Sequence, residues 1–220
     1  MDAKVRAMEI ITTLREATKG MILPASLSIT QEYGQDPYLI LISCLLSLRT
    51  KDTVSLPASL RLFKHAQTPD QMLQIPIETI EKLIYPSGFY HRKALQLHSV
   101  SADLIKRFKG HVPHDFDQLR SIKGVGPKTA NLVLAEGFGE PAICVDTHVH
   151  RIANRLGIIR TKTPEQTEIA LKELLPPEYW REVNYLLVMW GQNICVPISP
   201  KCSQCAVFPL CDRVGVTNSR

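Results

Sequence analysis

The chain has 220 residues, 45% of them hydrophobic, which is enough to bury a sizeable core. Its 26 Lys and Arg against 21 Asp and Glu give a net charge of +5, which permits nucleic-acid binding without demanding it. Aromatic residues make up only 6%, which argues against a surface that binds single strands by stacking. No apolar run suits a secretory leader or a membrane span, so we expect no targeting segment, no membrane contact and a cytoplasmic location.

Helical periodicity continues along the whole chain and predicts an all-α protein. The first helix is expected over residues 3–18, with Val5, Met8, Ile11 and Leu14 on one face. Asp36 followed by Pro37 is typical of a helix start. The run 38–48 behind them is apolar all round and predicts a buried helix, with a buried strand as the alternative.

Further helices are expected over 53–65 and 90–109, the first with Pro57 near its first turn. Thr163-Pro164-Glu165-Gln166 is a capping box that starts another helix. A final helix from about 178 to 191 leads towards Cys195.

Two glycines, Gly124 and Gly126, separate a short helix expected over 116–122 from one over 127–136. Glycines permit a tight turn and leave backbone N–H groups uncovered, and such groups at a helix N-terminus attract phosphate. The pattern indicates a helix–hairpin–helix, which holds a DNA backbone without reading its sequence. An ordinary turn between two helices is the alternative.

Lys128 follows the hairpin at about the second helical position. A cation there opposes the helix dipole and destabilises the helix by roughly 0.3–1 kcal/mol. The same field should lower the pKa of the ammonium. A neutral amine is what a Schiff-base nucleophile requires, and a phosphate contact is the alternative role. Asp146 precedes another helix and can serve as its N-cap with one carboxylate oxygen while the other takes part in chemistry.

Four cysteines near the end of the chain have the spacing C-x6-C-x2-C-x5-C, and they are Cys195, Cys202, Cys205 and Cys211. Disulfides, structural zinc and a [4Fe–4S] cluster are the three alternatives. One loop can supply a thiolate to each iron of a cubane, whereas zinc usually takes two close pairs of ligands. The spacing therefore favours iron–sulfur. Cys44 and Cys144 lie in apolar runs and are expected to be buried.

Three segments, Ile122–Ala130, Val145–Arg151 and the cysteine loop, resemble the endonuclease III family of helix–hairpin–helix DNA glycosylases, in the same order and spacing. The resemblance extends over nearly the whole chain. It implies a two-lobed fold, with a six-helix barrel over 29–140 and an iron–sulfur cluster domain formed by 1–28 and 141–220.

The resemblance also implies a function. Lys128 matches the family's nucleophile and Asp146 its catalytic aspartate, and the four cysteines match the ligands of its [4Fe–4S] cluster. The implied protein is a monomer of the nucleoid that binds double-stranded DNA with damaged or abasic sites. It is a bifunctional glycosylase and abasic-site lyase, with oxidised pyrimidines as the expected substrates. Alternatives are a monofunctional mismatch glycosylase, which Lys128 disfavours, and a catalytically idle DNA-damage binding protein.

DNA contacts follow from the same resemblance. Arg49 and Phe89 match the two segments that enter the gap left by a flipped base, where many family members have glutamine and leucine. Arg92, Lys93, Lys123 and Lys201 are candidate phosphate contacts, and a solvated surface charge is the alternative for each. For His148 the alternative is ordinary packing. The further candidates are Gly124, Gly126, Lys123, Arg92, Lys93, His148, Arg151 and Lys201.

Overall fold

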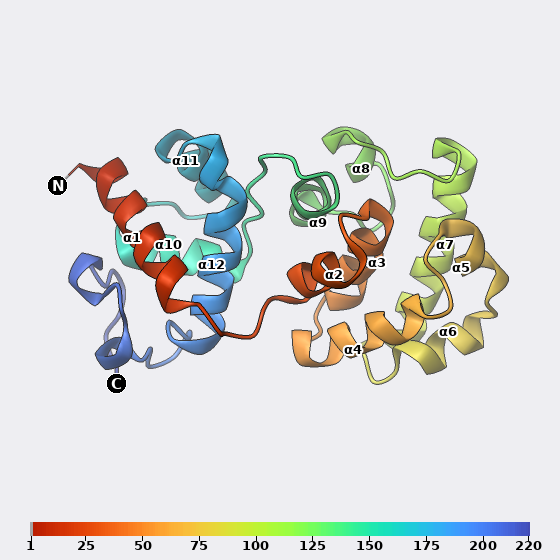
Figure 1. The fold of residues 1–220 in the computed structure, drawn as a ribbon, viewed down its shortest axis with the longest axis horizontal. Helices are drawn as coiled ribbons and strands as arrows, with labels where there is room; N and C mark the ends of the chain where they lie inside the picture. The colour runs from red at the N-terminus through yellow and green to blue at the C-terminus, as the bar shows by residue number, and fades with distance from the viewer. Residues whose placement is uncertain (1) are drawn as a thin grey trace. The chain divides into compact units, whose positions relative to one another are not determined.

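A computed structural model describes residues 2–220, and within that range it contains helices and no strand (Figure 1). The all-α prediction is confirmed. The chain divides into two compact units, one of Ala25–Glu140 and one that joins the residues up to Pro24 with Pro141–Arg220. The expected division placed the first boundary after residue 28, four residues further along. No helix among the described residues is long and apolar enough to cross a membrane.

The unit of residues 25–140 is built around one buried helix. Its helices are α2 (Ala25–Tyr33), α3 (Pro37–Ser47), α4 (Asp52–Phe63), α5 (Pro69–Gln74), α6 (Ile77–Ile84), α7 (Tyr90–Phe108), α8 (Phe116–Arg120), α9 (Pro127–Leu132) and the π-helical η1 (Val133–Gly137). Helix α3 contacts α2, α4, α7, α9 and η1, so neighbours cover it on every side.

Helix α3 forms as its sequence predicts. The Asp36 carboxylate accepts hydrogen bonds from the backbone N–H groups of Tyr38 (2.8 Å) and Leu39 (3.0 Å) and so caps the helix start. All nine residues from 38 to 46 are buried. Each fully buried Leu or Ile contributes roughly 1.5–3 kcal/mol. The strand alternative for this run is therefore wrong.

Pro57 departs from expectation, because it lies inside α4 and beyond the first turn. A proline there cannot donate to the carbonyl four residues earlier, which belongs to Thr53. Thr53 is exposed, so water can satisfy its carbonyl. The helix therefore continues past Pro57.

Two helix starts in different units use the same four-residue device. Thr163 caps α11 (Pro164–Leu174) by accepting from the Gln166 N–H at 3.3 Å, and the Gln166 side chain accepts from the backbone N–H of Lys162 at 2.9 Å. Thr68 and Gln71 repeat both bonds at the start of α5. The first capping box was predicted, and the second has the same Thr-Pro-acid-Gln pattern.

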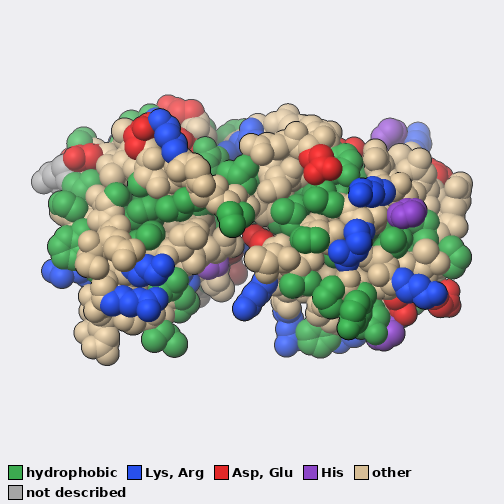
Figure 2. All heavy atoms as spheres, turned by 60° about the horizontal axis from the view of Figure 1, so that its bottom comes forward, with side chains coloured by type: hydrophobic (Ala, Val, Ile, Leu, Met, Phe, Trp, Pro, Cys, Tyr) green, Lys and Arg blue, Asp and Glu red, His purple; other side chains and the backbone are tan. Residues whose placement is uncertain are grey.

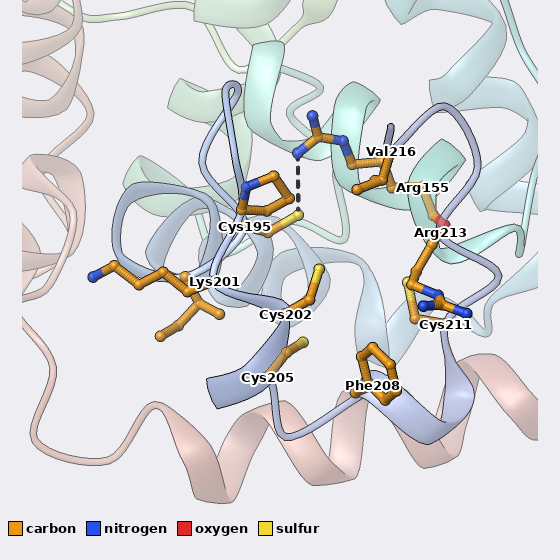
Figure 3. A pocket seen from close by; sticks show the side chains of 11 residues that line it. Arg155, Cys195, Lys201, Cys202, Cys205, Phe208, Cys211, Arg213 and Val216 are labelled. Atoms are coloured by element: carbon orange, nitrogen blue, oxygen red, sulfur yellow. Dashed lines mark hydrogen bonds between the residues drawn. The ribbon is translucent and has the colours of Figure 1, made fainter. Parts of the chain in front are cut away.

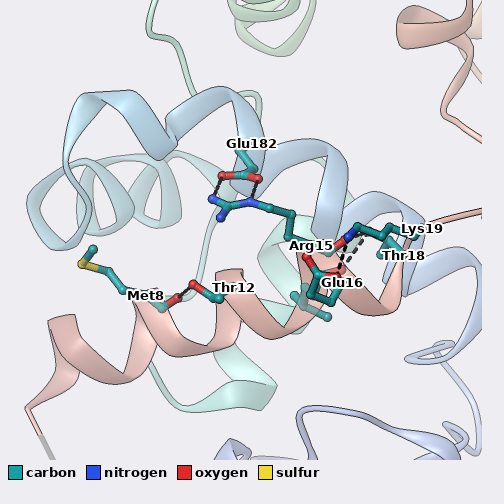
Figure 4. Close-up of polar contacts among 8 residues, drawn as sticks. Met8, Thr12, Arg15, Glu16, Thr18, Lys19 and Glu182 are labelled. Carbon is teal, nitrogen blue, oxygen red and sulfur yellow. Dashed lines mark hydrogen bonds and ion pairs between the residues drawn. The ribbon is translucent and has the colours of Figure 1, made fainter.

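The other unit packs two long helices from opposite ends of the sequence against each other. Its helices are α1 (Ala3–Ala17), α10 (Thr147–Leu156), α11 (Pro164–Leu174), α12 (Trp180–Asn193) and the 3-10 helices η2 (Pro177–Tyr179), η3 (Cys202–Gln204) and η4 (Phe208–Leu210). Arg15 of α1 pairs with Glu182 of α12 through two bonds of 2.6 and 2.7 Å (Figure 4).

The buried face of α1 differs from the expected one. It consists of Ala7, Ile10, Ile11 and Leu14, while Val5 is 55% exposed. Ile11 and Leu14 are buried as expected, whereas Val5 faces solvent and Ala7 and Ile10 complete the buried face in its place.

Candidate active site and cysteine pocket

The glycine hairpin lies between α8 and α9, as predicted. Ile122 and Val125 are buried and anchor it, while Lys123 between them is exposed. Gly124 has φ of +90°, a conformation that favours glycine. After Leu132 the second helix continues as the π-helix η1, so the predicted segment 127–136 is helical throughout.

The backbone at Gly126, unlike that at Gly124, does not require glycine. It is the N-cap of α9 with φ −91° and ψ 176°, an extended conformation open to any residue. A Cβ atom at this position would meet nothing within 4 Å. Folding of this unit therefore does not require glycine at position 126, whereas the positive φ of Gly124 does favour it.

Lys128 is exposed at the second position of α9. Its charge reaches Cys44 on α3, whose pKa is raised to about 12, mainly by burial, with Lys128 lowering it and Glu136 raising it. Glu136, only 1% exposed in η1, was not foreseen from the sequence. Cys44 is buried as expected. The buried Cys44 thiol thus lies within the electrostatic reach of both Lys128 and Glu136.

Asp146 is the N-cap of α10, as expected. Its Oδ1 atom accepts from the backbone N–H groups of His148 (2.8 Å) and Val149 (2.9 Å). Both capping bonds use the same oxygen, so the cap occupies one side of the carboxylate. Lys128 belongs to the unit of residues 25–140 and Asp146 to the other unit.

The structure brings Arg49 and Phe89 together, although 40 residues separate them in the sequence. The Arg49 guanidinium lies 4.6 Å from the centre of the Phe89 ring. Both residues are exposed and both have positive φ, +54° and +59°. The two loop tips thus form one exposed pair of stacked side chains.

Lys93 was expected to contact DNA, but its side chain is buried and does not reach the surface. It is 4% exposed, and its Nζ donates to the Leu46 carbonyl (2.5 Å) and to Thr50 Oγ1 (2.7 Å). Among the described residues no carboxylate pairs with it. Burial lowers the pKa of Lys93 to about 8. The amphipathic pattern of α7 did not reveal that this lysine points inward.

Arg151 was expected at DNA and is instead engaged within its own unit. Its guanidinium donates to the carbonyls of Gly191 (3.3 Å) and Cys195 (2.9 Å) and lies 3.1 Å from His148 Nδ1. Burial lowers its pKa. Arg151 therefore ties α10 to the end of α12 and to Cys195 behind it, and the DNA contact expected for it stays a prediction. Arg92 is exposed and Lys201 half-buried.

The four terminal cysteines line a single pocket, together with Arg155, Lys201 and Arg213 (Figure 3). The empty volume of this pocket is about 330 Å³, part of it open to solvent. Arg155 Nη1 lies 3.5 Å from Cys195 Sγ and 2.8 Å from the Val196 carbonyl. Burial raises the pKa values of Cys205 and Cys211. The sequence predicted this grouping of thiols.

The four thiols of the pocket match the donor set that a four-iron cluster requires. No group of three or more His, Cys, Asp or Glu side chains in the described part of the chain is close enough to hold one metal ion. A cubane carries one thiolate on each of four irons, so its thiolates stand further apart than the ligands of one ion. The cationic side chains around the pocket also suit the negative charge of a thiolate-bound cluster.

On the face shown in Figure 2, charged side chains are spread rather than concentrated. In Figure 2, Lys and Arg side chains occur in separate groups, with hydrophobic side chains between them. This distribution agrees with the modest net charge of +5. Any DNA binding therefore depends on local features such as the hairpin and the Arg49–Phe89 pair, since bulk charge alone is weak.

The family model for the HhH-GPD superfamily base excision DNA repair proteins matches residues 42–177, more than half of the chain. The chain belongs to this superfamily. Endonuclease III of Thermotoga maritima is 44% identical over 177 residues, which cover 80% of this chain and 83% of the relative. Endonuclease III of Escherichia coli K12 is 33% identical and aligns over 95% and 96% of the two chains. Within the superfamily the chain therefore belongs to the endonuclease III family.

Solved structures of endonuclease III with DNA have the same fold. A non-covalent endonuclease III–DNA complex has a TM-score of 0.83 at 31% identity and aligns over 97% of both chains. A trapped endonuclease III–DNA covalent intermediate has a TM-score of 0.82 at 31% identity, with 97% of each chain covered. These likenesses extend over both units.

Burial of Lys93 predicts how the stability of the protein depends on pH. The pKa of Lys93 falls from 10.5 to about 8 on folding, so above pH 8 the unfolded chain holds a proton that the folded chain has lost. The free energy of unfolding should therefore rise between about pH 8 and about pH 10 more steeply in the wild type than in Lys93→Met. Urea unfolding of both proteins across this range measures the difference, and parallel curves would contradict the pKa shift.

Proposed function

We propose that this chain is a bifunctional DNA glycosylase and abasic-site lyase that removes damaged bases, oxidised pyrimidines above all, from double-stranded DNA. The observation that carries the proposal is the exposed Lys128 at the second position of α9, directly after the glycine hairpin. A cation there is unfavourable for the helix. The need for a reactive amine close to a phosphate-binding hairpin accounts for a lysine at this position.

Two side chains share the chemistry. As the glycosidic bond breaks, positive charge develops at the sugar C1′ atom, and the Asp146 carboxylate stabilises it. The neutral Lys128 amine attacks C1′, so a C–N bond to the enzyme replaces the bond to the base. Opening of the sugar ring at the C1′–O4′ bond, with transfer of a proton from the amine to O4′, converts this adduct into an iminium, which acidifies the C2′ proton. Loss of that proton expels the 3′ phosphate by β-elimination and nicks the strand.

The hairpin and the paired loop tips serve binding. Backbone N–H groups around Gly126 hold a phosphate, with Lys123 and Arg92 as further phosphate contacts. The target nucleotide leaves the stack, which costs least for damaged, weakly stacked bases. Arg49 and Phe89 then fill the gap beside the unpaired partner base.

The cysteine pocket completes the proposal. Cys195, Cys202, Cys205 and Cys211 would hold a [4Fe–4S] cluster, whose role here is to fix the fold of the loop that presents Lys201. In this assignment residues 25–140 are the six-helix barrel domain and the remaining residues are the cluster domain. The protein acts as a monomer on the chromosome in the cytoplasm, since DNA is its substrate.

Trapping on abasic DNA tests the chemistry. Borohydride reduces a Schiff base to a stable amine, so the wild type should form a covalent protein–DNA adduct that gel electrophoresis detects. Lys128→Ala should give no adduct, with duplex affinity within about threefold of the wild type because only one surface charge is lost. Lys123→Ala is the matched control, and it should still trap. An adduct formed by Lys128→Ala would contradict the assignment.

The two hairpin glycines give a paired prediction. Gly126→Ala should change the free energy of unfolding by less than about 1 kcal/mol, because the lost freedom of the unfolded chain offsets the poorer N-cap that alanine makes. The same methyl group stands between the amides and the phosphate, so DNA affinity should fall about tenfold. Gly124→Ala should lower stability by roughly 1–3 kcal/mol because of the positive φ. Urea unfolding and fluorescence anisotropy measure the two effects. A Gly126→Ala protein with unchanged affinity would show that this glycine is not at the DNA.

Metal analysis tests the cluster. Protein purified without oxygen should be yellow-brown and contain about four irons and four sulfides per chain. Cys211→Ser should lose most of the iron, and Cys44→Ala should retain it, since Cys44 lies in the other unit. One zinc per chain without sulfide would favour the structural zinc alternative.

A further inference from the structure

A single ammonium group connects the two loops that carry Arg49 and Phe89. Lys93 lies in the first turn of α7, just after Phe89, and its Nζ donates to the carbonyl of Leu46 in the last turn of α3 (2.5 Å). The same Nζ donates to Thr50 Oγ1 at 2.7 Å. The last carbonyls of α3 have no partner within the helix, so the cation acts as a cap for that helix.

The Thr50 hydroxyl extends this connection to the second loop. Its oxygen accepts from Lys93 Nζ and from the Gly88 N–H (3.1 Å), and it lies 3.4 Å from the Leu48 carbonyl. One side chain thus binds α7, the Gly88 backbone and its own loop. The loops also approach closely, since a Cβ atom on Gly88 would lie 3.2 Å from the Arg49 carbonyl.

The loop tips need this support. Arg49 and Phe89 both have positive φ without being glycine, a strain of roughly 1–3 kcal/mol each that persists only where the surroundings hold the backbone. Their exposed side chains stack on each other at 4.6 Å. Around them Leu48 is 38% exposed and Phe89 52% exposed, so the apolar tips face solvent rather than a core.

Packing alone does not account for a lysine at this position. A buried cation loses its hydration, and a cation in the first turn of α7 also opposes the helix dipole. Methionine would fill nearly the same space at neither cost. What only the ammonium supplies is the pair of bonds to Leu46 and Thr50.

We propose that Lys93 is a positioning residue that holds the Arg49 and Phe89 loops together as one preformed wedge for the gap left by an extruded nucleotide. The inference rests on the proposed function, since it concerns how this enzyme opens a duplex. A wedge ordered during folding does not have to be ordered again on binding, which increases affinity for the opened duplex. Lys93 itself contacts no reacting atom.

Double-stranded and single-stranded substrates should respond differently to loss of the Lys93 bonds. An abasic site within a duplex has an opposing base and two stacked neighbours, so the wedge has a gap to fill. An abasic single strand offers no such gap, and the Schiff-base chemistry there does not need the wedge. Loss of the Lys93 bonds should therefore affect only the duplex reaction, whereas general damage to the fold would lower both.

The test compares nicking of an abasic oligonucleotide, single-stranded and in duplex, by the wild type, Lys93→Met, Thr50→Val and the double variant. We expect duplex nicking at subsaturating enzyme to fall about tenfold in each variant, with single-strand nicking within about twofold of the wild type. The loss in the double variant should be smaller than the two single losses combined, because both substitutions remove the bond between Lys93 Nζ and Thr50 Oγ1. Thr50→Ser, which keeps the hydroxyl, should restore duplex activity, and Lys82→Met, an exposed lysine of α6, is the control.

A second readout is independent of chemistry. With 2-aminopurine opposite the abasic site, binding of the wild type should increase fluorescence as the wedge disturbs stacking, and Lys93→Met at saturation should give less than about half that increase. Equal losses on both substrates, or no loss on duplex together with an unchanged fluorescence increase, would overturn the proposal. A wild type that cannot nick either substrate would overturn the lyase function instead, and the fluorescence result would still decide the role of Lys93.

Discussion

The burial of α3 on all sides is the constraint on which the rest of the unit of residues 25–140 depends. A helix without a polar face must be covered by several neighbours, and here α2, α4, α7, α9 and η1 cover it. Burial also requires that both helix ends be satisfied. Asp36 does this at the start, and Lys93 does it at the end. The position at which α3 ends then determines where the loop with Arg49 leaves the core.

Several of the residues that we assign to function locally cost stability. Lys93 and Lys128 are cations in the first turns of α7 and α9, against the helix dipole. Arg49 and Phe89 have left-handed backbones without being glycine. Each of these features is unfavourable on its own, and the surrounding core supplies the stability that retains it. The binding loops and the proposed nucleophile are therefore held by the same buried helix.

Much of the local structure was predictable because it depends on neighbours in the sequence. The cap at Asp36, the capping box at Thr163 and the turn at Gly124 all follow from bonds within a few residues. The position of Pro57 inside α4 was harder to predict, because it is tolerated only if the Thr53 carbonyl, which loses its hydrogen bond within the helix, faces water. The buried face of α1 was predicted in part, since Ile11 and Leu14 are buried as expected while the choice between Val5 and Ala7 depends on how α1 packs in its unit.

The sequence alone determined the helical class, the hairpin and the four-cysteine loop, because residue type and short spacing carry that information, whereas the proposed roles of Lys128 and Asp146 came from the resemblance to the family. Only the tertiary structure decided which cations are available to a ligand. Lys93 and Arg151 looked like surface charges in the sequence, and both donate their hydrogen bonds to carbonyls within their own units. Whether a long side chain points to water or to a buried carbonyl depends on elements far away in the sequence. For the same reason the stacking of Arg49 on Phe89, and the Thr50 hydroxyl that joins their loops, became visible only in three dimensions.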